Sequence, residues 1–268
     1  MKKATINIMF ICALLIVLAG CGSSKGTAGE EKEAKVLRVA TDAAYAPMEY
    51  IDKGELTGFD VDFIKAVAKE AGYEVKVENT GWDPLFVEIE NKRADLAVSS
   101  ITIDEKRKQS YDFSHPYFLS TNKILVPKGS PIKSAADLKD KIVAVQAGTT
   151  GMAVAEKVLG VNNKNIKKFE NNNLAILELT KGGADAVIAD VAIVNEYVKN
   201  NPKDQLTIID EESFDKEYYG VMFPKGTKEL KEEFNEAINA IFKNGEYAKI
   251  YQQWFGEEPD METLKQQQ

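Results

Sequence analysis

The sequence has few of the side chains on which metal sites and disulfide frameworks depend. It contains two cysteines, Cys12 and Cys21, and one histidine, His115. No ligand-spaced cluster of acidic residues offsets this scarcity, so we predict neither a metal site nor a cofactor. The histidine stands between Ser114 and Pro116 without a partner serine or cysteine at a recognisable spacing, which favours a structural role over a catalytic one.

An excess of basic charge, which nucleic-acid binding requires, is also lacking: Asp and Glu number 42 against 34 Lys and Arg. The formal net charge at pH 7 is −8, and no cluster of lysine and arginine forms the basic face that phosphate binding needs. The hydrophobic content of 44% is typical of a globular chain, and 268 residues suffice for one large or two ordinary domains. We therefore expect a globular protein with a buried core and no nucleic-acid partner.

The amino terminus carries a pattern typical of a bacterial lipoprotein signal. A short basic start precedes an apolar run over residues 6–18, which is too short and wrongly flanked for a stable transmembrane helix. The run leads into Leu18-Ala19-Gly20-Cys21, where small residues admit a peptidase and the cysteine becomes the lipid-bearing first residue. We predict residues 1–20 as the signal peptide and Cys21 as the lipidation site of an extracytoplasmic protein anchored to the cell membrane. Cys12 is removed with the signal, so we expect no internal disulfide.

The remaining chain predicts a tether followed by two α/β lobes. Residues 21–35 have no large apolar side chain after the cysteine, which is typical of a flexible tether. Beyond it, strands and helices alternate and the alternation restarts twice. This pattern predicts two lobes joined by two crossing strands, near residues 122–126 and 217–221. We assign residues 36–123 and 221–268 to the first lobe and 124–220 to the second, and expect a hinge between them.

Two local predictions concern how this chain turns. Asp83 before Pro84 is a favourable helix start, which would leave Trp82 just outside the helix and free to face a cleft. Residues 218–223 are apolar enough to form one strand that crosses back to the first lobe.

The run Ser99-Ser100-Ile101-Thr102 is a candidate anion site. It follows a short apolar strand, so its backbone amides and hydroxyls should face the crevice beyond the carboxyl ends of the sheet. Arg107 adds a planar guanidinium, which can bind a carboxylate through two parallel hydrogen bonds. Pairing of Arg107 with a surface acid is the alternative.

These features together resemble the extracytoplasmic solute-binding proteins of ABC importers, specifically the family for polar amino acids. The resemblance covers nearly everything after the tether, and its markers agree in order and spacing. The markers are Tyr45-Ala46-Pro47-Met48-Glu49, Gly58-Phe59-Asp60-Val61-Asp62, Trp82, Thr102 with Arg107, Phe113-Ser114-His115-Pro116-Tyr117, Gln146-Ala147-Gly148-Thr149-Thr150, Asp190, and Tyr251-Gln252-Gln253-Trp254-Phe255-Gly256.

The resemblance implies two Rossmann-like lobes joined by two hinge strands, the periplasmic binding protein type II fold, with an amino acid held between the lobes. It implies that the ligand's carboxylate meets Arg107, Ser100, Thr102 and Thr150, and that its ammonium meets Asp190. A role for Asp190 as a helix cap, and for Trp82 as ordinary core, are the alternatives. The full set of expected ligand-binding residues is Asp42, Tyr45, Trp82, Ser99, Ser100, Thr102, Arg107, Gln146, Thr149, Thr150 and Asp190.

The resemblance also favours a cationic ligand. In the family's basic amino acid binders, aromatic residues at the positions of Tyr45 and Trp82 enclose the ligand's stem, and an acid at the position of Asp42 faces its distal charge. We expect arginine first, then lysine or histidine. Glutamine, cystine or glutamate binding is the alternative, although Gln146 stands where a glutamine binder can have lysine. A less favoured alternative is an enzyme resembling cyclohexadienyl dehydratase. We expect no enzymatic activity, a monomer, and an ABC permease as partner.

Overall fold

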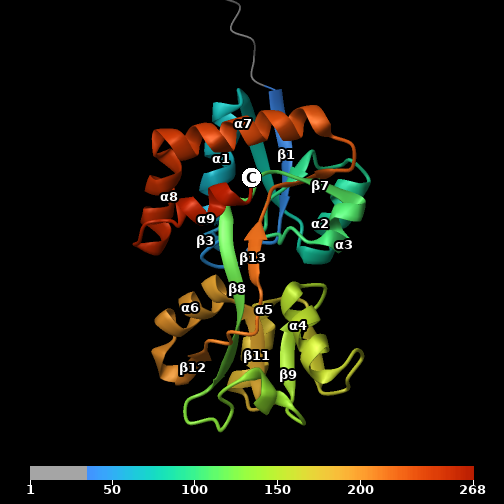
Figure 1. Ribbon diagram of the computed structural model, residues 1–268, viewed down its shortest axis with the longest axis vertical. Helices are drawn as coiled ribbons and strands as arrows, with labels where there is room; N and C mark the ends of the chain where they lie inside the picture. Colours follow the sequence, from blue (N-terminus) through green and yellow to red (C-terminus); the bar gives the residue numbers. More distant parts are fainter. Residues whose placement is uncertain (1–34) are drawn as a thin grey trace, which may run out of the picture. The chain divides into compact units, whose positions relative to one another are not determined.

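The structure is a computed structural model that describes residues 35–268 (Figure 1). The predicted signal peptide, Cys21 and all but the last residue of the predicted tether lie outside the described residues. Within residues 35–268, no helix combines the length and the apolar character that crossing a bilayer requires.

The first lobe is built on a five-stranded sheet with the order β5-β1-β6-β14-β7. β1 is parallel to both β5 and β6, whereas β14 runs antiparallel to β6 and β7. The carboxyl ends of β1 and β6 therefore meet at one edge, and Asp42 and Ser99 follow them there. The strands are β1 (Lys35–Thr41), β5 (Tyr73–Asn79), β6 (Leu96–Ala97), β7 (Tyr111–Phe113) and β14 (Met222–Pro224).

Helices and a small antiparallel sheet of order β2-β3-β4 complete this lobe. Phe59 and Phe63 on α1 stack with Tyr117 and contact Tyr247 of α8, which forms an aromatic core in the lobe. The elements are α1 (Phe59–Glu70), α2 (Trp82–Glu90), α3 (Glu105–Ser110), α7 (Lys228–Asn244), α8 (Glu246–Phe255), α9 (Met261–Gln266), β2 (Ala44–Tyr45), β3 (Glu49–Asp52) and β4 (Glu55–Thr57).

The second lobe is built on a sheet with the order β10-β9-β11-β8-β12. β9, β10 and β11 are mutually parallel, and β8 runs antiparallel to β11 and β12. Gln146 ends β9 and Asp190 ends β11, so both lie at the carboxyl edge of this sheet. The elements are β8 (Phe118–Pro127), β9 (Val143–Gln146), β10 (Ile166–Phe169), β11 (Ala186–Asp190), β12 (Leu206–Ile209), α4 (Thr150–Leu159), α5 (Asn172–Thr180), α6 (Val191–Asn200), η1 (Ala135–Leu138) and η2 (Pro202–Asp204).

β8 and β13 (Lys216–Tyr219) run side by side between the lobes (Figure 1). The predicted single strand over residues 218–223 is wrong, because β13 ends at Tyr219 and β14 begins at Met222. Gly220 lies at the break, where a Cβ would come within 2.7 Å of the Ile103 side chain, so the close packing there favours glycine. At the break, the Ser114 hydroxyl accepts the Val221 N–H at 2.9 Å, and the chain leaves β8 for β6 and β7.

The start of α2 also differs from its prediction. Trp82 is the first residue of the helix, and Gly81 precedes it as N-cap with φ 81°. Glycine adopts this left-handed conformation without steric cost, so the helix begins two residues earlier than a cap at Asp83 would place it. Pro84 then lies in the first turn, where a missing N–H leaves no hydrogen bond unmade.

Candidate ligand-binding site

The carboxyl edges of the two sheets enclose one cavity. The structure brings together all eleven predicted residues and adds Glu49. The lining residues are Asp42, Tyr45, Glu49, Trp82, Ser99, Ser100, Thr102, Arg107, Gln146, Thr149, Thr150 and Asp190.

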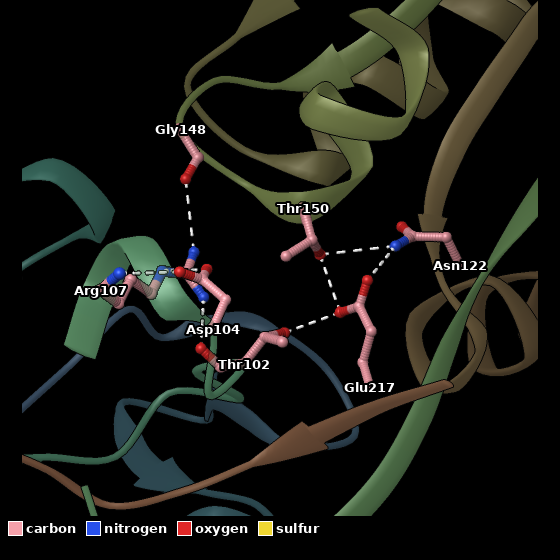
Figure 2. A network of polar contacts seen from close by, with 7 residues as sticks. All are labelled: Thr102, Asp104, Arg107, Asn122, Gly148, Thr150 and Glu217. Carbon is pink, nitrogen blue, oxygen red and sulfur yellow. Dashed lines mark hydrogen bonds and ion pairs between the residues drawn. The ribbon is translucent and has the colours of Figure 1, made fainter. Parts of the chain in front are cut away.

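Arg107 lies at one end of the cavity with its side chain only 11% exposed. It donates to Thr102 O at 2.9 Å in its own lobe and to Gly148 O at 3.4 Å in the second (Figure 2). Its guanidinium lies 5.5 Å from the centre of the Trp82 ring, within cation–π range. Burial lowers the pKa of Arg107, and the neighbouring acids Asp104 and Glu217 oppose that shift, so the side chain remains a cation.

The alternative interpretation paired Arg107 with a nearby acid. Asp104 is such an acid, but the two side chains form only a long ion pair. Asp104 is the N-cap of α3, and its carboxylate accepts the Arg107 backbone N–H at 2.7 Å. The ion pair between the two side chains is longer, 3.5 Å from Arg107 Nε to the carboxylate. The guanidinium therefore keeps donor capacity for a further anion in the cavity.

Two backbone positions supply further donors beside Arg107. Thr102 pairs with Tyr219 in an isolated antiparallel bridge, in which the bonds run from Ile103 N–H to Tyr218 O and from Gly220 N–H to Ile101 O. In this non-hydrogen-bonded pairing the N–H of Thr102 points away from β13.

The second backbone position is the start of α4. Thr149 is the N-cap and accepts the Met152 N–H at 3.2 Å. The N–H groups of Thr150 and Gly151 belong to the first turn, which has no intrahelical acceptors. They add the partial positive charge of the helix terminus to this end of the cavity.

Asp190 supplies a buried acceptor in the same cavity. It stands at the N-cap position of α6, but its side chain makes no capping hydrogen bond. The alternative prediction, that Asp190 simply caps the helix, is therefore wrong. One oxygen accepts the hydroxyl of Tyr45 from the other lobe, and the second, Oδ1, is buried with no partner among the described residues. Burial raises the pKa of Asp190, while the Tyr45 hydrogen bond and the charge of Arg107 lower it.

The far end of the cavity is also acidic. Gln146 Nε2 donates to Asp42 Oδ2 at 3.3 Å, and the orientation of that amide is fixed by Asn172, which donates to Gln146 Oε1 at 2.8 Å. Burial raises the pKa of Asp42, and the Gln146 hydrogen bond partly offsets this effect. Trp82 Nε1, which lies nearer to Gly148 and Arg107, is buried without a partner among residues 35–268.

Glu49 was not predicted as a site residue, although it belongs to one of the sequence markers. It is fully buried on β3; Oε1 accepts the Ser99 hydroxyl at 2.7 Å, and Oε2 has no partner among the described residues. Burial and the nearby charge of Asp60 raise its pKa well above the ordinary value. An acid between apolar residues is a weak sequence signal, and no spacing rule connects it to Ser99.

Asp60 supports the floor of the cavity from α1. It accepts the Ser100 N–H at 2.7 Å and the Tyr117 hydroxyl at 2.8 Å, and burial raises its pKa to about 6. These bonds hold Ser100 at φ 50°, a left-handed conformation that is uncommon for serine.

Comparisons with known proteins agree with this architecture. Residues 37–257 match the family described as bacterial extracellular solute-binding proteins, family 3, and the chain belongs to this family. Its fold is the periplasmic binding protein type II fold, as the resemblance implied.

Three similar proteins illustrate the relationship. A probable histidine-binding protein from Neisseria gonorrhoeae is 39% identical over 260 residues, which cover 96% of this chain and 97% of the relative. The crystal structure of the arginine-, lysine-, histidine-binding protein ArtJ from Geobacillus stearothermophilus is 51% identical, with a TM-score of 0.84 over 86% of this chain and 100% of that one. An ancestral arginine-binding protein bound to glutamine is 41% identical, with a TM-score of 0.78 over 83% and 98% of the two chains.

Proposed function

We propose that this protein is the lipid-anchored substrate-binding component of an ABC importer, and that it captures a cationic amino acid by closing its two lobes. Arginine is the first choice, followed by lysine or histidine. The observation that carries the proposal is the polarity of one cavity, which has a guanidinium with two backbone donor sites at one end and buried carboxylates elsewhere. Such a cavity matches an α-amino acid, whose carboxylate and ammonium need opposite partners.

The carboxylate would bind between the lobes. Arg107 and the Thr102 N–H approach it from the first lobe, and the first turn of α4 approaches it from the second. The ammonium would bind Asp190, whose Oδ1 is a buried acceptor without a partner among residues 35–268. The Ser100 carbonyl would be a further acceptor. Burying these pairs on closure strengthens each of them, because the surrounding dielectric constant falls.

The charge of the cavity supports a cationic side chain. Asp42 and Asp190 line it, against the single guanidinium of Arg107. Glu49 is left out of this count, because burial raises its pKa well above the ordinary value. A neutral amino acid would add no net charge, whereas arginine or lysine would add one positive charge to this acidic environment. Tyr45 and Trp82 provide aromatic faces for the stem or guanidinium of such a ligand.

Similar proteins support the same ligand class. ArtJ binds arginine, lysine and histidine, and it is 51% identical to this chain. Glutamine is a second candidate, because the 41% identical ancestral arginine-binding protein was solved with glutamine bound. An ABC permease in the cell membrane would receive the ligand from a monomeric protein held there by acylated Cys21. Labelling of the wild type, but not of Cys21→Ser, by a fatty-acid analogue would support the anchor; equal labelling would contradict it.

Calorimetric titration of the purified protein tests the ligand class. Protein freed of retained ligand by unfolding and refolding would be titrated with arginine, lysine, histidine, glutamine, cystine and glutamate. We expect arginine to bind most tightly and glutamate most weakly. Tightest binding of glutamine would support the second candidate, and absence of heat with all six would contradict both.

A further inference from the structure

Glu217 is a buried acid of the crossing strand β13, with 8% of its surface exposed. Its Oε2 accepts the hydroxyl of Thr102 at 2.7 Å and that of Thr150 at 2.9 Å, and its Oε1 accepts Asn122 Nδ2 at 2.6 Å. Figure 2 shows the carboxylate at the centre of these three donors. Thr102 belongs to the first lobe and Thr150 begins α4 in the second, so one carboxylate is bonded to both lobes.

These contacts determine what the two threonines can offer a ligand. Each threonine hydroxyl has one hydrogen to donate, and Glu217 accepts both. The groups that remain for a ligand carboxylate are the backbone N–H groups of Thr102 and Thr150, which the site geometry leaves without partners in their own elements. Glu217 thus fixes the rotation of both side chains away from the ligand position.

We propose that Glu217 is a positioning residue for ligand capture, which accepts both threonine hydroxyls only when the lobes are closed and thereby aligns their backbone N–H groups on one carboxylate. The inference rests on the proposed function, because it assumes that the lobes separate and close around an amino acid. Asn122 lies on β8, the other crossing strand, and donates a hydrogen bond to Glu217. Both strands between the lobes therefore contribute to holding the Glu217 carboxylate in place.

Charged neighbours make the contribution of Glu217 dependent on pH. Burial raises the pKa of Glu217 to about 7, the charge of Asp190 adds to the shift, and the two threonine hydrogen bonds and the charge of Arg107 oppose it. On the outer side of α4, Lys157 pairs with Asp215 at 3.8 Å, and both line a groove that also includes Glu217.

The sign of this effect follows from linkage. With the lobes apart, water would solvate Glu217 and its pKa would return toward the ordinary value. The closed ligand-free form therefore binds more protons than the open form between the two values, and it loses stability relative to the open form as the pH rises through about 7.

Paired substitutions test the positioning role in the full chain. We expect Glu217→Leu, which removes both acceptor oxygens, to weaken arginine binding about 10-fold to 100-fold, and Glu217→Gln, which keeps one, to lose less. Glu236→Leu and Glu236→Gln are matched controls at an exposed site on α7, and they should bind as the wild type does.

The threonines distinguish positioning from a general effect on the fold. Thr102→Val and Thr150→Val remove the hydroxyls but keep the backbone N–H groups, so each should weaken binding. In a Glu217→Leu background the same changes should cost little more, because their acceptor is already absent. Wild-type affinity of Glu217→Leu, or threonine losses that add fully to its loss, would overturn the proposal.

A ligand-free measurement separates this proposal from the function on which it rests. Small-angle scattering of the empty wild type should show a shift toward an open form as the pH rises from about 5 to about 7. Glu217→Gln should show a smaller shift, since its side chain does not titrate. Identical curves would overturn the role of Glu217, whereas failure of every amino acid to bind would overturn the proposed function and leave this test in place.

Discussion

Replacing Arg107 by alanine tests the proposed carboxylate clamp. In the wild type the guanidinium is nine-tenths buried and would meet a ligand carboxylate at the same end of the cavity as the first turn of α4. Without it, the carboxylate would be buried with backbone donors only. Removing one partner of a buried ion pair costs about 3–5 kcal/mol, which corresponds to a fall in affinity of about 100-fold to 5,000-fold.

The cost to the fold should be much smaller. Arg107→Ala removes donors from the carbonyls of Thr102 and Gly148, and a lost hydrogen bond of this kind costs about 0.5–1.5 kcal/mol. Asp104 is 34% exposed at its side chain, so water can solvate it when the guanidinium is absent. The variant should therefore fold normally and lose binding.

Calorimetry with two further variants makes this result specific. Arg107→Lys keeps the charge but loses the planar fork, and we expect an intermediate loss of about 10-fold. Arg93→Ala removes an exposed arginine that pairs with Glu88 at 2.8 Å, and it should leave affinity unchanged. Binding by Arg107→Ala within threefold of the wild type would refute the clamp.

Three further predictions follow from the same site. Asp42→Asn should weaken arginine binding at least about 10-fold more than glutamine binding, because a glutamine side chain brings no distal charge to Asp42. Equal losses for the two ligands would show that Asp42 does not recognise the distal charge of arginine. Arginine affinity should fall as the pH is lowered into the acidic range, because protons compete with the ligand for Asp42 and Asp190, whose pKa values burial raises. Titrations at several pH values would contradict this if affinity stayed flat. Arginine at about 100 times its Kd should raise the free energy of unfolding by about 2.7 kcal/mol and Tm by roughly 5–10 °C. Scanning calorimetry measures this shift in Tm, with glutamate as the comparison ligand. An unchanged Tm with arginine would contradict binding.

Much of the cavity could be predicted because strand ends impose a simple geometry. Polar residues directly after buried strands share one edge of a sheet, which is why Asp42, Ser99, Gln146 and Asp190 are found together. The pairing of these edges across two lobes required the family resemblance, since hydrophobic periodicity does not specify how two sheets face each other.

The residues that escaped prediction are buried acids within strands. Glu49 and Glu217 lie on β3 and β13, where alternation predicts which face a side chain occupies but not what that face meets. Their partners Ser99, Thr102 and Thr150 are distant in sequence, so no local spacing identifies the contacts. The division of residues 218–223 into two strands depended likewise on tertiary contacts, since β13 pairs with β8 whereas β14 pairs with β6 and β7.

A crystal structure of the protein with arginine bound would test the central claim most directly. We predict the ligand carboxylate within hydrogen-bonding distance of the Arg107 guanidinium and the N–H groups of Thr102 and Thr150, the ammonium on Asp190, and the distal guanidinium facing Asp42. Arginine bound outside this cavity, or with its carboxylate turned away from Arg107, would contradict the account.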